Sequence, residues 1–284
     1  MPSITISGTD YSYQITKPVA NSRLPVLVFV HGWLLSHHYW QPVVDILQAD
    51  YQCLRYDLRG FGTSRNIQNS VKRDYSLAAY AQDLCDFLAR LKVENAWLIG
   101  HSLGGSIALW SADLAPQVIQ GVIGVNSGGG IYVREEFAKF RNAGQQIVKF
   151  RPTWLPYIPG LSLIFSRMMV YRPISLNWAR QRIIDLINAD SEAALGSLLQ
   201  TTTEEEVHYL PRLVSRLAQP VYFIAGQKDR IMEPKYVHHL ASFHRLFDSG
   251  HGNVLELPEC GHLAPLEVPV ALAEMTLSII NKHL

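Results

Sequence analysis

Short runs of apolar residues recur along the chain and predict its strands. The run at residues 26–30 is wholly apolar and lacks alternation, which is typical of a strand covered on both faces. Residues 4–6 and 11–16 alternate around a turn at 8–10 and predict an antiparallel hairpin. The remaining strands are expected at residues 52–56, 96–99, 118–126, 220–226 and 253–257.

Stretches with helical periodicity separate these strands. They are expected at residues 39–48, 76–92, 103–112, 234–243 and 269–282, and Ser76 is a suitable N-cap for the second. Because strand and helix alternate, the sheet is predicted to be mostly parallel, with right-handed connections.

The alternation stops over residues 131–216. This stretch contains no convincing strand, several helical segments and a proline-rich middle at 152–173. We therefore expect a core formed by 1–130 and 217–284, with 131–216 inserted as a helical cap, or lid.

Composition narrows the function classes. Of 284 residues 48% are hydrophobic, and the formal net charge is +1, so nothing indicates a nucleic-acid partner. The cysteines Cys53, Cys85 and Cys260 are too few and too scattered for a disulfide framework, and no Cys pair indicates zinc. No leader sequence and no apolar run of about 20 residues is present, so a cytoplasmic protein without a transmembrane segment is expected.

One stretch carries a chemical motif, Gly100-His101-Ser102-Leu103-Gly104. Ser102 falls where a predicted strand turns directly into a predicted helix, and the two glycines relieve crowding at such a turn. The following helix directs backbone N–H groups, that of Leu103 first, toward an oxyanion formed beside the serine. The same residues could also form only a tight strand-to-helix crossing, so the rest of the chain must decide.

Polar residues gather at the predicted carboxyl ends of the other strands, which share one edge of a parallel sheet. A nucleophilic serine needs a base and a carboxylate that orients that base. His262 follows the last strand and Gly261, and is the best candidate base; a histidine on a surface loop is the alternative. Asp229 follows the preceding strand and is the candidate acid, with helix capping as its alternative role.

The order Ser102, Asp229, His262, with the turn His31-Gly32-Trp33 and the loop at 57–64, resembles the α/β-hydrolase superfamily. The resemblance covers nearly the whole chain outside the cap. It implies an α/β-hydrolase fold, a doubly wound sheet of about eight strands, and a triad of Ser102, Asp229 and His262. It further implies an oxyanion hole from the backbone N–H groups of Trp33 and Leu103, and no metal or organic cofactor.

Several neighbouring residues receive other roles. His31 is expected to hold the oxyanion turn by hydrogen bonds, and Asp57 and Arg59 to brace the loop as a pair. The pairs His37-His38 and His238-His239 lack further metal ligands and are interpreted as surface histidines.

The cap is expected to determine specificity. Residues 147–178 contain four basic residues and no acidic residue among many apolar ones. Such a segment can line an apolar acyl pocket, lie against a lipid surface, or pack on the body of the fold. The candidate pocket residues are Trp33, Leu34, His101, Trp154, Met168 and Met169.

The leading hypothesis is therefore a serine hydrolase that cleaves an ester or thioester of a small molecule with a sizeable apolar part. The turn at residues 31–35 is also similar to that of cofactor-free perhydrolases and carbon–carbon bond hydrolases, which the same triad can serve. An acyltransferase and a non-catalytic ligand receptor on the same fold stay open as well.

Overall fold

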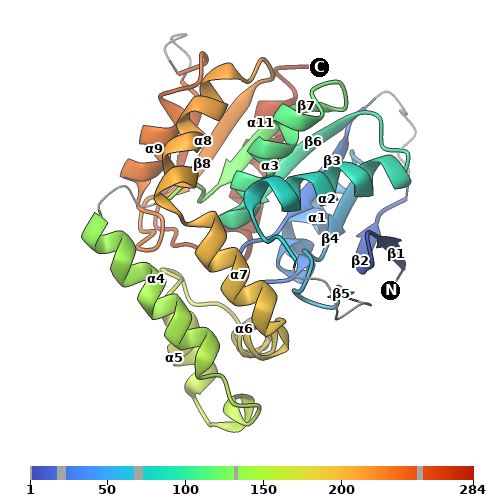
Figure 1. Ribbon diagram of the computed structural model, residues 1–284. Coiled ribbons are helices and arrows are strands. Elements are labelled where there is room, and N and C mark those ends of the chain that lie inside the picture. The colour runs from blue at the N-terminus through green and yellow to red at the C-terminus, as the bar shows by residue number, and fades with distance from the viewer. Residues whose placement is uncertain (1, 18–23, 67–72, 131–133, 248–251) are drawn as a thin grey trace.

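A computed structural model describes residues 2–17, 24–66, 73–130, 134–247 and 252–284. A single twisted sheet runs through the middle of the molecule with helices on both faces (Figure 1). Its strands follow the order β1-β2-β4-β3-β6-β7-β8-β9, and the short β5 pairs with β2. The strands are β1 (Ser3–Ile6), β2 (Thr9–Ile15), β3 (Val26–Val30), β4 (Cys53–Tyr56), β5 (Arg65–Asn66), β6 (Ala96–His101), β7 (Ile119–Val125), β8 (Val221–Gly226) and β9 (Val254–Leu257).

The pairing of neighbouring strands changes once along the sheet, from antiparallel to parallel. β1 and β2 form the expected antiparallel hairpin, and β2 pairs antiparallel with β4. From β4 through β3, β6, β7, β8 and β9 every pairing is parallel. The carboxyl ends of these six strands therefore lie along one edge, as the sequence predicted.

Helices cover the two faces of the sheet and bury the alternate side chains of each strand. Val28 and Val30 of β3 belong to one core, whereas Leu27 and Phe29 belong to the other. The first core is closed by α2 (Leu77–Arg90), α3 (Leu103–Leu114), α8 (Glu204–Arg216) and α9 (Pro234–Ala241). The second is closed by α1 (Gln41–Leu47), α10 (Ala264–Glu267) and α11 (Pro269–Ile280). Two covered faces explain why β3 is a continuous apolar run.

The remaining helices stand off one end of the sheet (Figure 1). They are α4 (Arg134–Lys149), the 3-10 turn η2 (Leu155–Tyr157), α5 (Leu161–Arg167), α6 (Leu176–Asn188) and α7 (Ser191–Thr201); a further 3-10 turn, η1 (His37–Trp40), precedes α1. No strand occurs between residues 134 and 216, as expected, and residues 131–133 of the expected insertion lie outside the described residues.

The last helix of the expected insertion, α8, contributes side chains to the first core. Leu210, Leu213 and Val214 of α8 are buried in the core that α3 and α9 share, although this helix lies within 131–216. The last helix of the expected insertion therefore packs on the core together with α3 and α9.

Candidate active site

Ser102 occupies a sharp turn between β6 and α3. Its backbone has φ 52° and ψ −119°, a region that costs a non-glycine residue free energy and persists only where the surroundings enforce it. A Cβ at Gly100 would collide with the backbone of Gly104, and a Cβ at Gly104 would collide with the carbonyl groups of Val30 and His31. Both glycines are required because strand, turn and helix approach at backbone distance.

The turn after β3 runs beside the serine. A Cβ added at Gly32 would lie 3.2 Å from Ser102 Cβ, so the backbone that leads into Trp33 passes next to this side chain. Within the described residues, the backbone N–H groups of Trp33 and Leu103 donate to no protein acceptor. Two uncommitted donors therefore lie on the chain segments that flank Ser102.

His262 and Asp229 form a buried pair. His262 Nδ1 lies 2.7 Å from Asp229 Oδ2, and because a carboxylate only accepts, Nδ1 donates. In the tautomer that carries its proton on Nδ1, Nε2 is an acceptor. In the described part of the chain, no hydrogen bond joins Ser102 Oγ to this ring; such bonds often tighten only when substrate is bound.

Asp229 is held by more than the histidine. Its Oδ1 accepts from the backbone N–H groups of Ile231 (2.8 Å) and Met232 (2.9 Å), and Asn126 Nδ2 donates to Oδ2 over 2.7 Å. Burial alone would raise the pKa of Asp229, but His262 and these donors lower it below its ordinary value. The carboxylate is therefore kept ionised and fixed in orientation.

Asn126 is the last residue of the strand expected at residues 118–126, and its role was not predicted. It follows β7 with φ 48°, a conformation that asparagine tolerates better than most residues. Nδ2 also donates to the carbonyl group of Gly261 over 3.1 Å. One amide thus ties the aspartate to the loop that carries His262.

Two contacts hold the backbone of His262 itself. His101 Nε2 donates to the His262 carbonyl group over 2.7 Å, and His262 N donates to the carbonyl group of Met169 over 2.8 Å. Burial and the neighbouring His262 lower the pKa of His101 to about 3, so His101 stays neutral. The first contact comes from the turn at Ser102 and the second from the cap.

Glu267 joins the same loop to the cap, and no motif near Glu267 predicts this role. Its carboxylate accepts from four backbone N–H groups: those of Gly261 (3.0 Å), Leu263 (3.1 Å), Tyr171 (2.8 Å) and Arg172 (2.9 Å). Two of these donors flank His262, and two belong to the segment between α5 and α6. We call this arrangement the Glu267 clamp.

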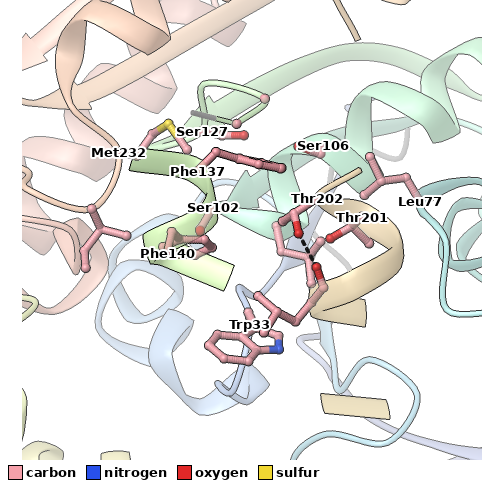
Figure 2. Close-up of a pocket in the computed structure, with 15 residues that line it drawn as sticks. Trp33, Leu77, Ser102, Ser106, Ser127, Phe137, Phe140, Thr201, Thr202 and Met232 are labelled. Atoms are coloured by element: carbon pink, nitrogen blue, oxygen red, sulfur yellow. Dashed lines mark hydrogen bonds between the residues drawn. The ribbon is translucent and has the colours of Figure 1, made fainter. Parts of the chain in front are cut away.

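A cavity of about 90 Å³ opens beside Ser102. Figure 2 shows Phe137 and Phe140 next to Ser102, with Thr201 and Thr202 across the cavity. None of its described lining residues is charged. They are Trp33, Leu77, Ser102, Leu103, Ser106, Ser127, Gly129, Gly130, Phe137, Phe140, Leu198, Thr201, Thr202, Ile231 and Met232.

Of the six candidate pocket residues, Trp33 lines this cavity and the other five do not. Trp154 and Met168 are exposed, because η2 and α5 face outward while α4 and α7 supply the cap side of the cavity. Leu34 and His101 are buried elsewhere, and Met169 packs in a separate apolar cluster with Leu35, Tyr39, Val170 and Leu263.

His31 is fully buried in the turn that follows β3. His31 holds its turn as expected: Nε2 accepts from Leu58 N (2.9 Å), and Nδ1 donates to Gly32 O (2.8 Å). Burial lowers the pKa of His31 to about 4, so the ring is neutral.

The expected pair of Asp57 and Arg59 is wrong. Asp57 accepts from the backbone and ring of His37, whereas Arg59 pairs with Asp83 over 3.3 Å. The interpretation of His37 as a surface residue is also wrong, because His37 is fully buried against this carboxylate. His238, by contrast, is half-exposed and pairs with Glu256.

Within the described residues, no group of three His, Cys, Asp or Glu side chains is arranged to hold a metal ion. Likewise, none of the described helices is long and apolar enough to cross a bilayer.

The chain matches the family model of the α/β-hydrolase fold over residues 25–167. It therefore belongs to the α/β-hydrolase family, and the expected fold class and hydrolase type of enzyme are confirmed.

Proteins similar to this chain have names that specify different reactions. A 2-succinyl-6-hydroxy-2,4-cyclohexadiene-1-carboxylate synthase of Escherichia coli is 28% identical over 239 residues, covering 83% of this chain and 90% of its own. A thermophilic esterase from Thermogutta terrifontis has a similar structure, with a TM-score of 0.78, 18% identity and 99% coverage of both chains. An enol-lactonase from Burkholderia xenovorans has a TM-score of 0.76 and 18% identity, covering 99% of this chain and 100% of its own.

Proposed function

We propose that this protein is a serine hydrolase that cleaves an ester or thioester through an acyl-enzyme on Ser102. The observation that carries the proposal is the position of Ser102. It lies on a strained turn that lines an uncharged cavity, and the chain segments beside it carry two backbone N–H groups, of Trp33 and Leu103, that have no protein acceptor within the described residues.

In this mechanism His262 Nε2 takes the proton of Ser102 Oγ as the oxygen attacks the substrate carbonyl carbon. The carbonyl oxygen becomes an oxyanion, which accepts from the N–H groups of Trp33 and Leu103. His262 then gives the proton to the alcohol or thiol as its bond to the carbonyl carbon breaks, which leaves the acyl group on Ser102 Oγ. In the second half, His262 takes a proton from water as the water oxygen attacks the acyl carbon. The bond from that carbon to Ser102 Oγ breaks, the acid is released, and His262 returns the proton to Ser102.

Asp229 supports both halves without taking a proton. Its hydrogen bond to Nδ1 keeps the imidazole in the tautomer with Nε2 free, and its negative charge stabilises the imidazolium that forms. Its lowered pKa favours this permanently ionised state.

The cavity supports an apolar acyl group of limited size. A volume of about 90 Å³ corresponds to roughly six to nine water-sized groups. Because no described lining residue is charged, a neutral acyl chain fits better than one that carries a carboxylate. The names of the structural neighbours, an esterase and an enol-lactonase, agree with carbonyl–oxygen bond cleavage.

The test is a series of p-nitrophenyl esters from acetate to dodecanoate. We expect kcat/KM to rise to a maximum near six carbons and to fall for longer chains, because longer chains exceed the cavity. Ser102→Ala should reduce turnover at least 10³-fold and abolish labelling by a fluorophosphonate probe, whereas the exposed Ser215→Ala should change neither. Unchanged turnover in Ser102→Ala would refute the proposal.

A second candidate is the reaction type of the E. coli relative, whose name specifies a carboxylate product. The uncharged cavity weighs against it. The ester series also separates the remaining alternatives. Labelling of Ser102 without turnover would favour a ligand receptor, and release of product only with an added alcohol or peroxide would favour an acyltransferase or a perhydrolase.

A further inference from the structure

Large apolar side chains are exposed in one short part of the cap. Tyr157 is 84% exposed, Phe150 75% and Ile164 68%, values unusual for such residues in a packed fold. Nine of the 15 large hydrophobic residues found exposed lie between residues 150 and 176, less than a tenth of the chain. We call these nine the cap patch: Phe150, Trp154, Tyr157, Ile158, Leu163, Ile164, Met168, Tyr171 and Leu176.

On α5 the exposed residues form one face. Leu163, Ile164, Arg167 and Met168 follow the spacing that places them on the same side of a helix, and all are exposed. On the other side, Ser162 and Ser166 are buried, and Arg182 of α6 lies over the Phe165 ring at 5.4 Å. The helix therefore packs with its more polar side inward and presents an apolar side to the surroundings, the reverse of a usual surface helix.

The charged residues of this segment are all basic, although Arg182 is buried and Arg172 pairs with Glu259 of the core. Between residues 137 and 184 there are eight basic residues and no aspartate or glutamate. Lys149, next to Phe150, and Arg167, at the end of α5, are exposed and make no ion pair within the described residues. A chance surface would mix both signs.

We infer that the cap patch docks on a bilayer surface that contains anionic lipid. Apolar side chains enter the boundary between headgroups and acyl chains, and Trp154 and Tyr157 suit that boundary because their rings are amphipathic. Lys149 and Arg167 then meet the lipid phosphates, which are of the opposite charge. The segment that contains η2 and α5 projects away from the sheet (Figure 1), whereas Tyr171 lies beside the core at Glu267.

The test is co-sedimentation of the full chain with sucrose-loaded vesicles of phosphatidylcholine, with or without 30% phosphatidylglycerol. We expect at least tenfold stronger binding to the anionic vesicles, reduced by 0.5 M NaCl. Y157S/I164S should lower binding at least tenfold. K149E/R167E should abolish the preference for anionic lipid, since each cation near the surface contributes about fivefold.

The matched control is F243S/V270S, which removes two exposed apolar residues outside the patch and should bind as the wild type does. All variants should hydrolyse a soluble ester at the wild-type rate, which shows that they fold and keeps this test separate from the proposed function. Absence of binding to anionic vesicles, or equal binding by Y157S/I164S, would overturn the inference. So would a concentration-dependent dimer abolished by Y157S/I164S, because a second copy would then cover the patch.

Discussion

The Glu267 clamp is predicted to position His262, and Glu267→Gln tests it. The carboxylate accepts from four backbone N–H groups, two of which flank His262. Glutamine has nearly the same shape but only one side-chain acceptor oxygen. If that oxygen replaces Oε2, it can keep the three donors at Gly261, Tyr171 and Arg172. The NH₂ group then faces the N–H of Leu263, donor against donor.

The magnitude follows from the number of bonds. The three hydrogen bonds to Oε2 lose the carboxylate charge, and each becomes weaker by about 1 kcal/mol. The bond from Leu263 is lost at a cost of about 1 kcal/mol, so the sum is about 4 kcal/mol. Because the side chain is partly exposed, we halve this sum to about 2 kcal/mol of unfolding free energy. For a chain of this size that lowers Tm by about 4 to 6 °C. Since a displacement of about 1 Å in a catalytic group can cost about 10²-fold in rate, kcat should fall at least tenfold.

The assay measures kcat and KM for a short-chain p-nitrophenyl ester at 25 °C, together with thermal unfolding of the same samples. Glu274→Gln is the matched control, because Glu274 is exposed on α11 and should alter neither quantity. A variant with lowered Tm and wild-type kcat would show that the clamp stabilises the cap without positioning His262. A variant that matches Glu274→Gln in both would refute the reasoning.

Two further predictions concern the surroundings of the site. Asn126→Ala removes the donor to Asp229 and Gly261, so kcat should fall about tenfold with little change in KM. Steady-state kinetics measure both constants, and an unchanged kcat would contradict the prediction. Burial raises the pKa of Asp185 to about 6, so folding favours its protonated form and its ionisation costs stability as pH rises from about 4 through 6. Asp185→Asn should therefore raise the urea midpoint at pH 7 by an amount equivalent to about 1 to 3 kcal/mol and have little effect at pH 4. If the midpoint rises equally at both pH values, the ionisation of Asp185 is not the cause.

The sheet was predictable because its signals are local. The run at residues 26–30 is apolar throughout since both faces of β3 are covered, and this can be read without knowing what covers them. The turn at Ser102 was predictable for the same reason, because its two glycines are within two residues of the serine, although Gly104 also makes room for the backbone of Val30 and His31 at the end of another strand.

The roles that were predicted wrongly or missed depend on contacts between residues far apart in the sequence. His37 and His38 are adjacent polar residues, yet one is fully buried because Asp57, 20 residues away, accepts from it. The Glu267 clamp joins residues 95 and 96 apart, and nothing near Glu267 marks it. Likewise, the sequence shows that Met168 and Met169 are apolar, but which of them faces outward depends on how α5 packs on α6.

The contact of Met169, Tyr171 and Arg172 with the histidine loop limits how the cap can be exchanged in engineering or in evolution. A cap is usually treated as a module that can be replaced without loss of the core chemistry. Here the last few residues after α5 complete the hydrogen bonding of His262 and Glu267. A transplanted cap must therefore supply its own carbonyl group and two N–H groups at this junction, or the new cap would come with a displaced His262.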